Sequence, residues 1–205
     1  MLFYACSTNP GKLADFALAS RESNLADLTI VPLPGMPDIP VPDETGATFE
    51  ENAALKAAYY SRYTTHPVFA DDSGLEVDAL GGEPGIFSAR FAGPRATDGQ
   101  NNQLLLDRLR PLLNRHARFI CALAAAQAGR LITAVQGSVE GEILDELRGT
   151  NGFGYDPLFF YPPLGKSFGE LTPDVKLSVS HRGHAMRALL LQLEGWKSSG
   201  GMEAL

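Results

Sequence analysis

The sequence predicts an α/β protein with a mixed β-sheet, and three observations lead to this class. Short apolar runs that suit buried strands alternate with longer segments in which apolar residues recur at helical spacing. Two apolar runs, 118–126 and 131–143, are separated by a short turn and predict a hairpin, whereas other runs are separated by whole helices. The chain has 205 residues, of which 44% are hydrophobic, which is enough to bury the core of one domain with up to two lobes.

The first part of the chain predicts a strand, a polar turn, a helix and a second strand. Residues 2–6 form a compact apolar run, and the turn at 9–11 contains proline and glycine. Apolar residues at helical spacing follow, and the next apolar run, at 28–33, predicts a strand. Repeated prolines between 32 and 46 exclude a regular helix there and predict an extended, exposed loop.

A second helix and a third strand follow this loop. Thr48 and Glu51 fit a capping box for a helix that extends to about Tyr63. The segment 67–72 predicts a strand that ends at a pair of adjacent aspartates.

Glycines and prolines interrupt regular structure between 81 and 94. After them, Thr97 or Asp98 can cap a helix that is rich in leucine. The hairpin follows this helix, and a glycine-rich loop at 152–156 then leads into another strand.

The C-terminal part predicts one last helix and a tail. Ser180 is expected to cap this helix and Gly195 to end it. We therefore expect a single two-lobed domain over residues 1–195 and a short flexible tail over residues 196–205.

Composition and charge exclude several classes of protein. A net charge of −7 argues against a general polyanion binder, so we expect no nucleic-acid partner. Cys6 and Cys121 lie in apolar runs without metal-ligand spacing, which predicts reduced, buried thiols rather than a disulfide or a zinc site. The N-terminal apolar run has no basic region and is far shorter than a membrane-spanning helix. We expect a cytoplasmic protein that has no membrane partner.

The segment STNPGK, residues 7–12, can bind phosphate. It presents backbone N–H groups and a helix N-terminus after a strand, both of which attract phosphate, and Lys12 adds a positive charge. It is not a Walker A loop, because the pattern GxxxxGK[ST] is absent. The alternative is an ordinary polar turn with a solvated lysine.

The stretch ADDSG, residues 70–74, can bind a divalent cation. Mg²⁺ prefers oxygen ligands and is often held by one or two carboxylates together with substrate phosphates. Successive side chains of a strand point to opposite faces, so Asp71 and Asp72 have different tasks unless the strand has already ended. The alternative is an Asx-turn after a strand. Glu44, in the proline-rich loop, can join the same metal or can simply be solvated.

Two later segments can bind a nucleotide base. In GTNGFGYDP, residues 149–157, Phe153 and Tyr155 offer faces on which a base can stack, a contact worth about 1–3 kcal/mol. The alternative there is a tight turn with aromatic core anchors. In SHRGH, His181 and Arg182 stand at a helix start, where cations oppose the helix dipole and an acceptor-rich ligand would explain them.

Five segments together resemble the inosine triphosphate pyrophosphatase family. They are, in order, STNPGK, TFEENAALKA, ADDSGLEVDALGGEPGIFSARFAG, GFGYDPLFF and LSVSHRGHA, and the resemblance extends from Ser7 to about Leu190. It implies an elongated mixed β-sheet flanked by helices, two lobes with a central cleft, and a homodimer. It also implies Mg²⁺-dependent hydrolysis of dITP, ITP and XTP to the monophosphate and pyrophosphate.

The resemblance also implies roles for individual residues. Glu44 and Asp72 would hold Mg²⁺, and Asp72 would be the catalytic base that deprotonates a water for attack on the α-phosphorus. Arg182 and His181 would donate to O6 of hypoxanthine or xanthine, where adenine carries an amino group instead. The implied substrate-binding residues are Ser7, Thr8, Asn9, Pro10, Gly11, Lys12, Ser73, Phe153, Gly154, Tyr155, Asp156, Lys176, His181 and Arg182.

Two other functions remain open at this point. A Maf-like nucleotide pyrophosphatase for other modified nucleotides would keep acidic metal ligands but not the SHRG motif. A catalytically silent nucleotide-binding protein or an RNA-binding module belongs to a different class, and the acidic charge weakens the RNA-binding version. Pyrophosphate release from dITP separates these alternatives.

Overall fold

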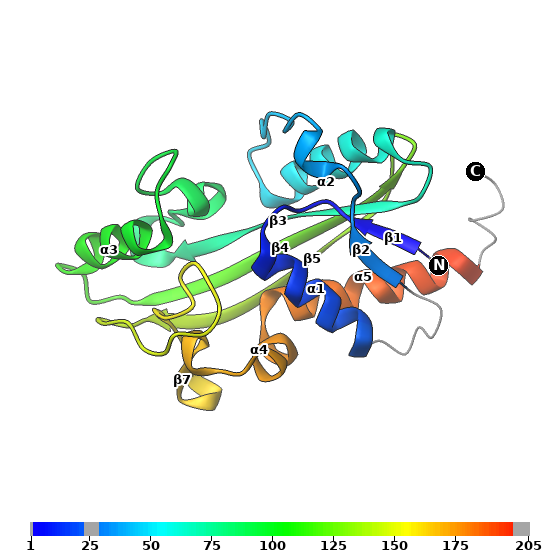
Figure 1. Cartoon of the computed structure of the whole chain (residues 1–205). Helices are drawn as coiled ribbons and strands as arrows, with labels where there is room; N and C mark the ends of the chain where they lie inside the picture. Colours follow the sequence, from blue (N-terminus) through cyan, green and yellow to red (C-terminus); the bar gives the residue numbers. More distant parts are fainter. Residues whose placement is uncertain (1, 23–28, 199–205) are drawn as a thin grey trace. The chain divides into compact units, whose positions relative to one another are not determined.

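The computed structural model describes residues 2–22 and 29–198 and confirms the α/β class with a mixed sheet. Seven strands are hydrogen-bonded in the order β2-β1-β3-β4-β5-β6-β7 (Figure 1). The strands are β1 (Leu2–Ala5), β2 (Thr29–Pro32), β3 (Val68–Val77), β4 (His116–Gln127), β5 (Arg130–Ile143), β6 (Phe159–Tyr161) and β7 (Lys166–Ser167). The α-helices are α1 (Pro10–Glu22), α2 (Phe49–Tyr60), α3 (Asp98–Leu109), α4 (Pro173–Val179) and α5 (His181–Ser198).

The chain forms two compact units. The first unit consists of residues 1–72, 121–137 and 182–205, and the second of residues 73–120 and 138–181. The strands β3, β4 and β5 are long, and each contributes residues to both units. The elongated outline, the central cleft and the single domain over residues 1–195 stay predictions.

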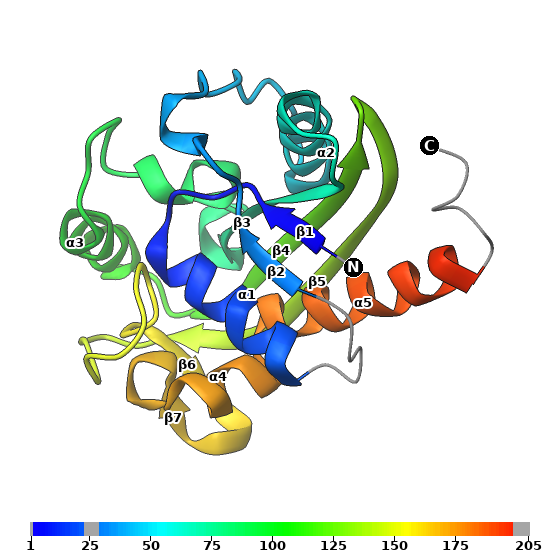
Figure 2. The ribbon, with the colours of Figure 1, turned by 45° about the vertical axis from the view of Figure 1, so that its right-hand side comes forward.

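The first unit is built on parallel strands. β1 lies between β2 and β3 and is parallel to both, as expected for strands that are joined through the helices α1 and α2. α2 lies on one side of these strands, and α1 and α5 lie on the other (Figure 1, Figure 2). Phe3, Phe16 and Phe69 are buried in this unit, and the rings of Phe16 and Phe69 meet edge to face with centroids 5.0 Å apart.

The second unit has an antiparallel edge and an aromatic core. β6 pairs antiparallel with β5 and with β7. Leu105 and Leu109, one turn apart on α3, are fully buried in the same cluster as Phe159 and Phe168. The centroids of the Phe119 and Phe159 rings lie 4.5 Å apart in this cluster. The two buried leucines therefore hold α3 on the sheet by apolar packing.

Two predicted helix starts are confirmed, but the predicted capping box of Thr48 and Glu51 is incomplete. Thr48 caps α2 by accepting a hydrogen bond from the Glu51 backbone N–H, while Glu51 reaches back to Ala47 N instead of Thr48 N. Thr97, rather than Asp98, caps α3, and Gln100 completes a reciprocal capping box with it.

Three predicted boundaries between residues 10 and 77 are wrong. α1 begins at Pro10, so Pro10 and Gly11 form its first turn, because proline lacks the N–H that a first turn leaves unpaired. α2 ends at Tyr60, and only a 3₁₀ turn, Ser61–Tyr63, continues it. β3 does not end at the aspartates but continues to Val77. β2 covers most of its predicted range, of which residue 28 lies outside the described residues.

The C-terminal helices also differ from the prediction. α4 was not predicted, although Pro173 at its first position is a helix-start signal. The predicted start of the last helix is confirmed, because Ser180 directly precedes His181, the first residue of α5. α5 continues through Gly195 to Ser198, and Gly195 does not adopt the left-handed conformation of a helix-ending glycine. Residues 196–198 of the predicted tail therefore belong to α5, and residues 199–205 lie outside the described residues. No helix within residues 2–22 and 29–198 combines the length and apolar character needed to cross a bilayer.

Candidate active site

The segment between β1 and α1 exposes the N-terminus of a helix. The Asn9 side chain accepts a hydrogen bond from the Lys12 backbone N–H at 3.1 Å, and Ser7 Oγ accepts one from Asn9 N at 3.2 Å. Thr8, Asn9 and Pro10 are exposed, so the first turn of α1 is accessible to a ligand. This is the arrangement that favours a bound phosphate.

The paired aspartates lie inside a continuous strand and contact different lysines. The Asp71 carboxylate forms an ion pair with Lys12 at 2.7 Å, and the Asp72 carboxylate forms one with Lys56 at 2.8 Å. Because side chains alternate along a strand, two neighbouring aspartates reach two different partners. The expectation that they have different tasks is therefore supported by their contacts, and the Asx-turn alternative does not apply within β3.

Lys56 joins two acids that are far apart in the sequence. Its Nζ lies 2.7 Å from Glu44 Oε1 and 2.8 Å from Asp72 Oδ1. Sequence reasoning had not singled out Lys56 for the site and assigned it only to a helix. The available signal was a lysine on a helix whose preceding neighbours on the same face, at positions 52 and 53, are an asparagine and an alanine.

Asn52, one turn before Lys56 on α2, holds the loop that carries Glu44. Its Oδ1 accepts a hydrogen bond from Gly46 N at 2.8 Å, and its Nδ2 lies 3.4 Å from Asp72 Oδ2. A Cβ at Gly46 would lie 2.7 Å from Asn52 Oδ1, so only glycine permits this approach. The helix α2 thus holds the loop that carries Glu44 and contacts the Asp72 carboxylate directly.

The two carboxylates fit a magnesium site. Glu44 and Asp72 both place an oxygen within 2.8 Å of one cation, the Lys56 ammonium, which shows that they converge. Mg²⁺ prefers oxygen ligands, and proteins often supply one or two carboxylates while substrate phosphates and water supply the other ligands. The described residues contain no group of three or more His, Cys, Asp or Glu side chains that could hold a metal.

The charges around the aspartates shift their pKa values in opposite directions. Burial of Asp71 would raise the pKa of its carboxyl group, but Lys12, Lys56 and Arg182 outweigh burial and lower that pKa below its ordinary value. Burial prevails at Asp72 and raises the pKa of its carboxyl group, although Lys56 opposes the rise. Asp71 is thus a fixed anion, whereas Asp72 has a greater affinity for a proton.

In the second unit, the glycine-rich loop folds around Asp156. Asp156 Oδ2 accepts a hydrogen bond from Phe153 N at 2.8 Å and pairs with Lys176 Nζ at 2.5 Å. The Lys176 ammonium also lies 5.1 Å from the centroid of the Phe153 ring. A Cβ at Gly152, whose φ is +77°, would lie 2.0 Å from Asp156 Oδ2, so glycine is required there.

The two aromatic side chains of this loop differ in exposure. Phe153 is half-buried, but Tyr155 is only 5% exposed and donates its hydroxyl proton to Ser88 O at 2.8 Å. The prediction that the Tyr155 ring offers a face to a base is wrong, because that ring belongs to the core. The core-anchor alternative applies to Tyr155, whereas stacking of a base on Phe153 stays a prediction.

The remaining predicted residues lie at the start of α5, where they are buried, and in β3. His181 is 1% exposed, and its ring stacks on Phe119 with centroids 4.6 Å apart. Arg182 is also buried, and its Nη1 lies 3.3 Å from Asp15 Oδ2. Ser73 is half-buried and directly follows Asp72.

Comparisons with known proteins place the chain among close relatives. Residues 3–192 match the Ham1 family. A protein of Acidobacterium capsulatum named dITP/XTP pyrophosphatase is 48% identical over 204 residues, which cover 95% of this chain and 99% of the relative. A Thermus thermophilus protein of the same name is 50% identical over 184 residues, covering 89% of this chain and 86% of the relative. The solved structure of the Staphylococcus aureus Ham1 protein is 40% identical with a TM-score of 0.83, over 95% of this chain and 99% of that one.

Proposed function

Because the chain belongs to the Ham1 family, we propose that it hydrolyses non-standard purine nucleoside triphosphates such as dITP, ITP and XTP to the monophosphate and pyrophosphate. Relatives that match nearly its full length bear the name dITP/XTP pyrophosphatase. The observation that carries the proposal is the convergence of Glu44 and Asp72 on one cation beside a phosphate-attracting helix N-terminus.

Glu44 and Asp72 would hold Mg²⁺ in this enzyme. A bound Mg²⁺ neutralises charge on the phosphates and polarises phosphorus. Lys12 and the backbone N–H groups of Thr8 and Gly11 would bind the phosphate chain, because a helix N-terminus and an ammonium both favour negative charge. Lys56, whose Nζ lies 2.8 Å from Asp72 Oδ1, would add a second positive charge.

Asp72 is the residue that can accept the proton. Its raised pKa makes its carboxylate a better base than a fully solvated aspartate would be. The oxygen of a water molecule forms a bond to the α-phosphorus, and the bond from the α-phosphorus to the bridging oxygen breaks. Asp72 takes the proton of the water, and pyrophosphate departs.

The second cluster of residues suits the purine. The half-buried Phe153 ring can stack on a base, and Lys176 is fixed beside it by Asp156. Donors from His181 and Arg182 would pair with O6 of hypoxanthine or xanthine and would face an amino group in adenine. A good pair of such contacts discriminates by about 1–3 kcal/mol. Ser73 would contact the substrate next to Asp72.

The catalytic role of Asp72 is tested by replacing it with asparagine. We expect Asp72→Asn to lower Mg²⁺-dependent pyrophosphate release from dITP about 100-fold or more, the contribution typical of a general base. Glu76→Gln is the matched control, because Glu76 lies in the same strand and pairs with Arg118 at 2.8 Å. This control should retain wild-type activity. A loss smaller than about tenfold in Asp72→Asn would contradict the assignment.

A panel of nucleoside triphosphates tests the substrate class. We expect pyrophosphate release from dITP, ITP and XTP to exceed release from dATP and from modified pyrimidine nucleotides. A preference for the modified pyrimidine nucleotides would favour the Maf-like alternative, and no release from any nucleotide would favour a silent binding protein. We further propose that the protein is cytoplasmic and forms a homodimer. Light scattering after gel filtration measures the molar mass and so tests for the dimer.

A further inference from the structure

Both backbone polar groups of Gly154 are held by side chains of α3. Gly154 N donates a hydrogen bond to Asp98 Oδ2 at 2.7 Å, and Asn102 Nδ2 donates one to Gly154 O at 3.0 Å. Asp98 and Asn102 are four residues apart on α3, so their side chains share one face of the helix. Together they hold a loop that is more than 50 residues away in the sequence.

This loop needs an external anchor. Gly152 and Gly154 both have positive φ, at +77° and +63°. Glycine has more backbone conformations to lose than any other residue, so ordering such a loop is costly. The two hydrogen bonds select one conformation of the Gly154 peptide, and Gly154 lies directly between Phe153 and the pair Tyr155 and Asp156.

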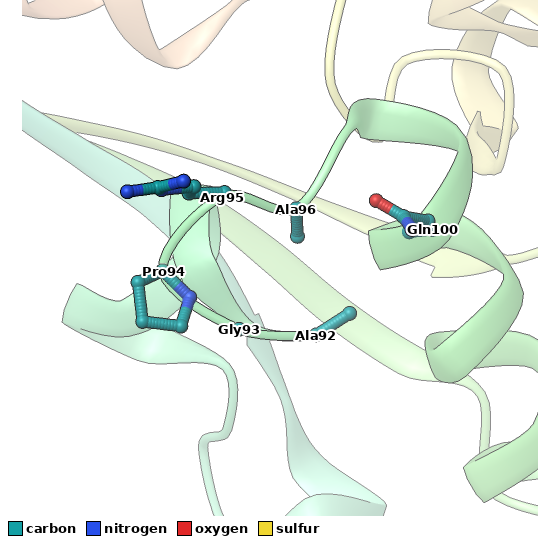
Figure 3. Close-up of a pocket in the computed structure, with 6 residues that line it drawn as sticks. All are labelled: Ala92, Gly93, Pro94, Arg95, Ala96 and Gln100. Atoms are coloured by element: carbon teal, nitrogen blue, oxygen red, sulfur yellow. The ribbon is translucent and has the colours of Figure 1, made fainter.

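The helix that provides this anchor is itself fixed by polar contacts. The loop before α3 borders an open pocket of about 410 Å³, which is lined by residues 92–96 and Gln100 (Figure 3). Asn101 links this loop to the helix, since its Oδ1 accepts from Ala92 N at 2.9 Å and its Nδ2 donates to Ala89 O at 3.2 Å. Buried leucines hold the other end of α3 in the core.

The polar environment of Asn102 argues against a purely stabilising role. Asn102 is 5% exposed, and its Oδ1 has no hydrogen-bond partner among residues 2–22 and 29–198. A buried acceptor without a partner lowers stability, so an apolar residue of similar size would suit a purely structural position better. The amide donor to Gly154 is the contact that an apolar residue could not make.

We propose that Asp98 and Asn102 are positioning residues that fix the Gly154 peptide and thereby hold Phe153 and Asp156 in place for recognition of the purine. This inference rests on the proposed function of the same loop. In this role, both residues act through the Gly154 peptide and not by contact with the substrate. They act on selectivity for the base, because the phosphate-binding residues belong to other elements.

The test compares binding of the two products. Asn102→Ala and, separately, Asp98→Ala should raise the inhibition constant of IMP by about 5- to 10-fold, the factor expected for one lost hydrogen bond. The inhibition constant of pyrophosphate should not change. The ratio of kcat/KM for ITP over ATP should fall by a similar factor. The conservative variant Asp98→Asn keeps an acceptor for Gly154 N and should restore the wild-type values.

Asn101→Ala is the matched control for stability. Asn101 neighbours Asn102 and is buried to a similar extent. Its truncation removes two hydrogen bonds, so the Tm of Asn101→Ala should fall at least as much as the Tm of Asn102→Ala. Its preference for ITP should stay at the wild-type value. An equal loss of preference in this control would overturn the positioning role, as would unchanged IMP inhibition in both Asn102→Ala and Asp98→Ala.

Failure of the proposed function is distinguishable from failure of this inference. Wild-type protein that releases no pyrophosphate from ITP would overturn both, and this result is seen before any variant is made. Active wild-type protein with unaffected variants would overturn the positioning role alone. Hydrogen exchange gives a second readout, because the Gly154 amide should exchange faster in Asp98→Ala than in Asp98→Asn without any substrate present.

Discussion

Removal of the Lys56 ammonium is the sharpest test of the electrostatics in the first unit. Lys56→Met keeps most of the side-chain length and its apolar stem but deletes the positive charge that lies within 2.8 Å of both Glu44 and Asp72. The two carboxylates then face each other without a cation between them. We expect a large loss in the free energy of unfolding.

The magnitude follows from the exposure of the three side chains. Loss of one partner from a buried ion pair costs about 3–5 kcal/mol, whereas loss from an exposed pair costs about 0–1 kcal/mol. The side chains of Lys56 and Asp72 are each 12% exposed, and that of Glu44 is 24% exposed. The cluster is therefore close to the buried case, and we expect a loss of about 2–4 kcal/mol near pH 7.5.

The loss should depend on pH in a defined direction. Burial already raises the pKa of Asp72, and Lys56 is the main charge that opposes this rise. Without Lys56 the pKa of Asp72 rises further above its unfolded value. A group of this kind stabilises the folded state at low pH, and the stability is lost as pH rises through the folded pKa. The difference between wild type and Lys56→Met should therefore shrink from pH 7.5 to pH 5.

Urea denaturation in the presence of EDTA measures this effect without competition from metal ions. Lys166→Met is the control, because Lys166 is exposed on β7 and its replacement should change stability by less than about 0.5 kcal/mol. A loss for Lys56→Met no larger than that of the control would refute the reasoning. A loss that grows as pH falls would refute the assigned direction of the Asp72 shift.

Two further predictions concern the backbone and the thiols. Gly152→Ala should reduce stability more than Gly154→Ala in urea titrations. Both substitutions place alanine in a left-handed conformation, which costs about 1–2 kcal/mol, but only the Cβ added at position 152 would also clash with Asp156 Oδ2, at 2.0 Å. Equal losses would show that the contact with Asp156 is unimportant. Burial raises the pKa of both Cys6 and Cys121 to about 12, so iodoacetamide at pH 8 should modify them only after unfolding. Rapid labelling of native protein would disprove this.

Local sequence patterns determined most elements of the fold. The Thr48 and Thr97 caps, the hairpin of β4 and β5 and the strand-then-helix start all depend on residues close together in the chain, and all were confirmed. The end of β3 was not predicted correctly, because two adjacent aspartates resemble a strand terminus. Within β3 their charges are matched by Lys12 and Lys56, and this compensation is invisible in the local sequence.

The sequence alone identified the acidic, basic and glycine-rich segments, because their chemistry is carried by residue types and short spacings. Only the tertiary structure decided which side chains meet. Lys56 bridges Glu44 and Asp72, Tyr155 turns into the core instead of offering its ring, and α3 holds Gly154. The contacts of Lys56 and of Gly154 join residues that are 12 or more positions apart, and the orientation of Tyr155 depends on its burial. Pairings at that separation are fixed by the packing of whole elements, and no local pattern encodes them.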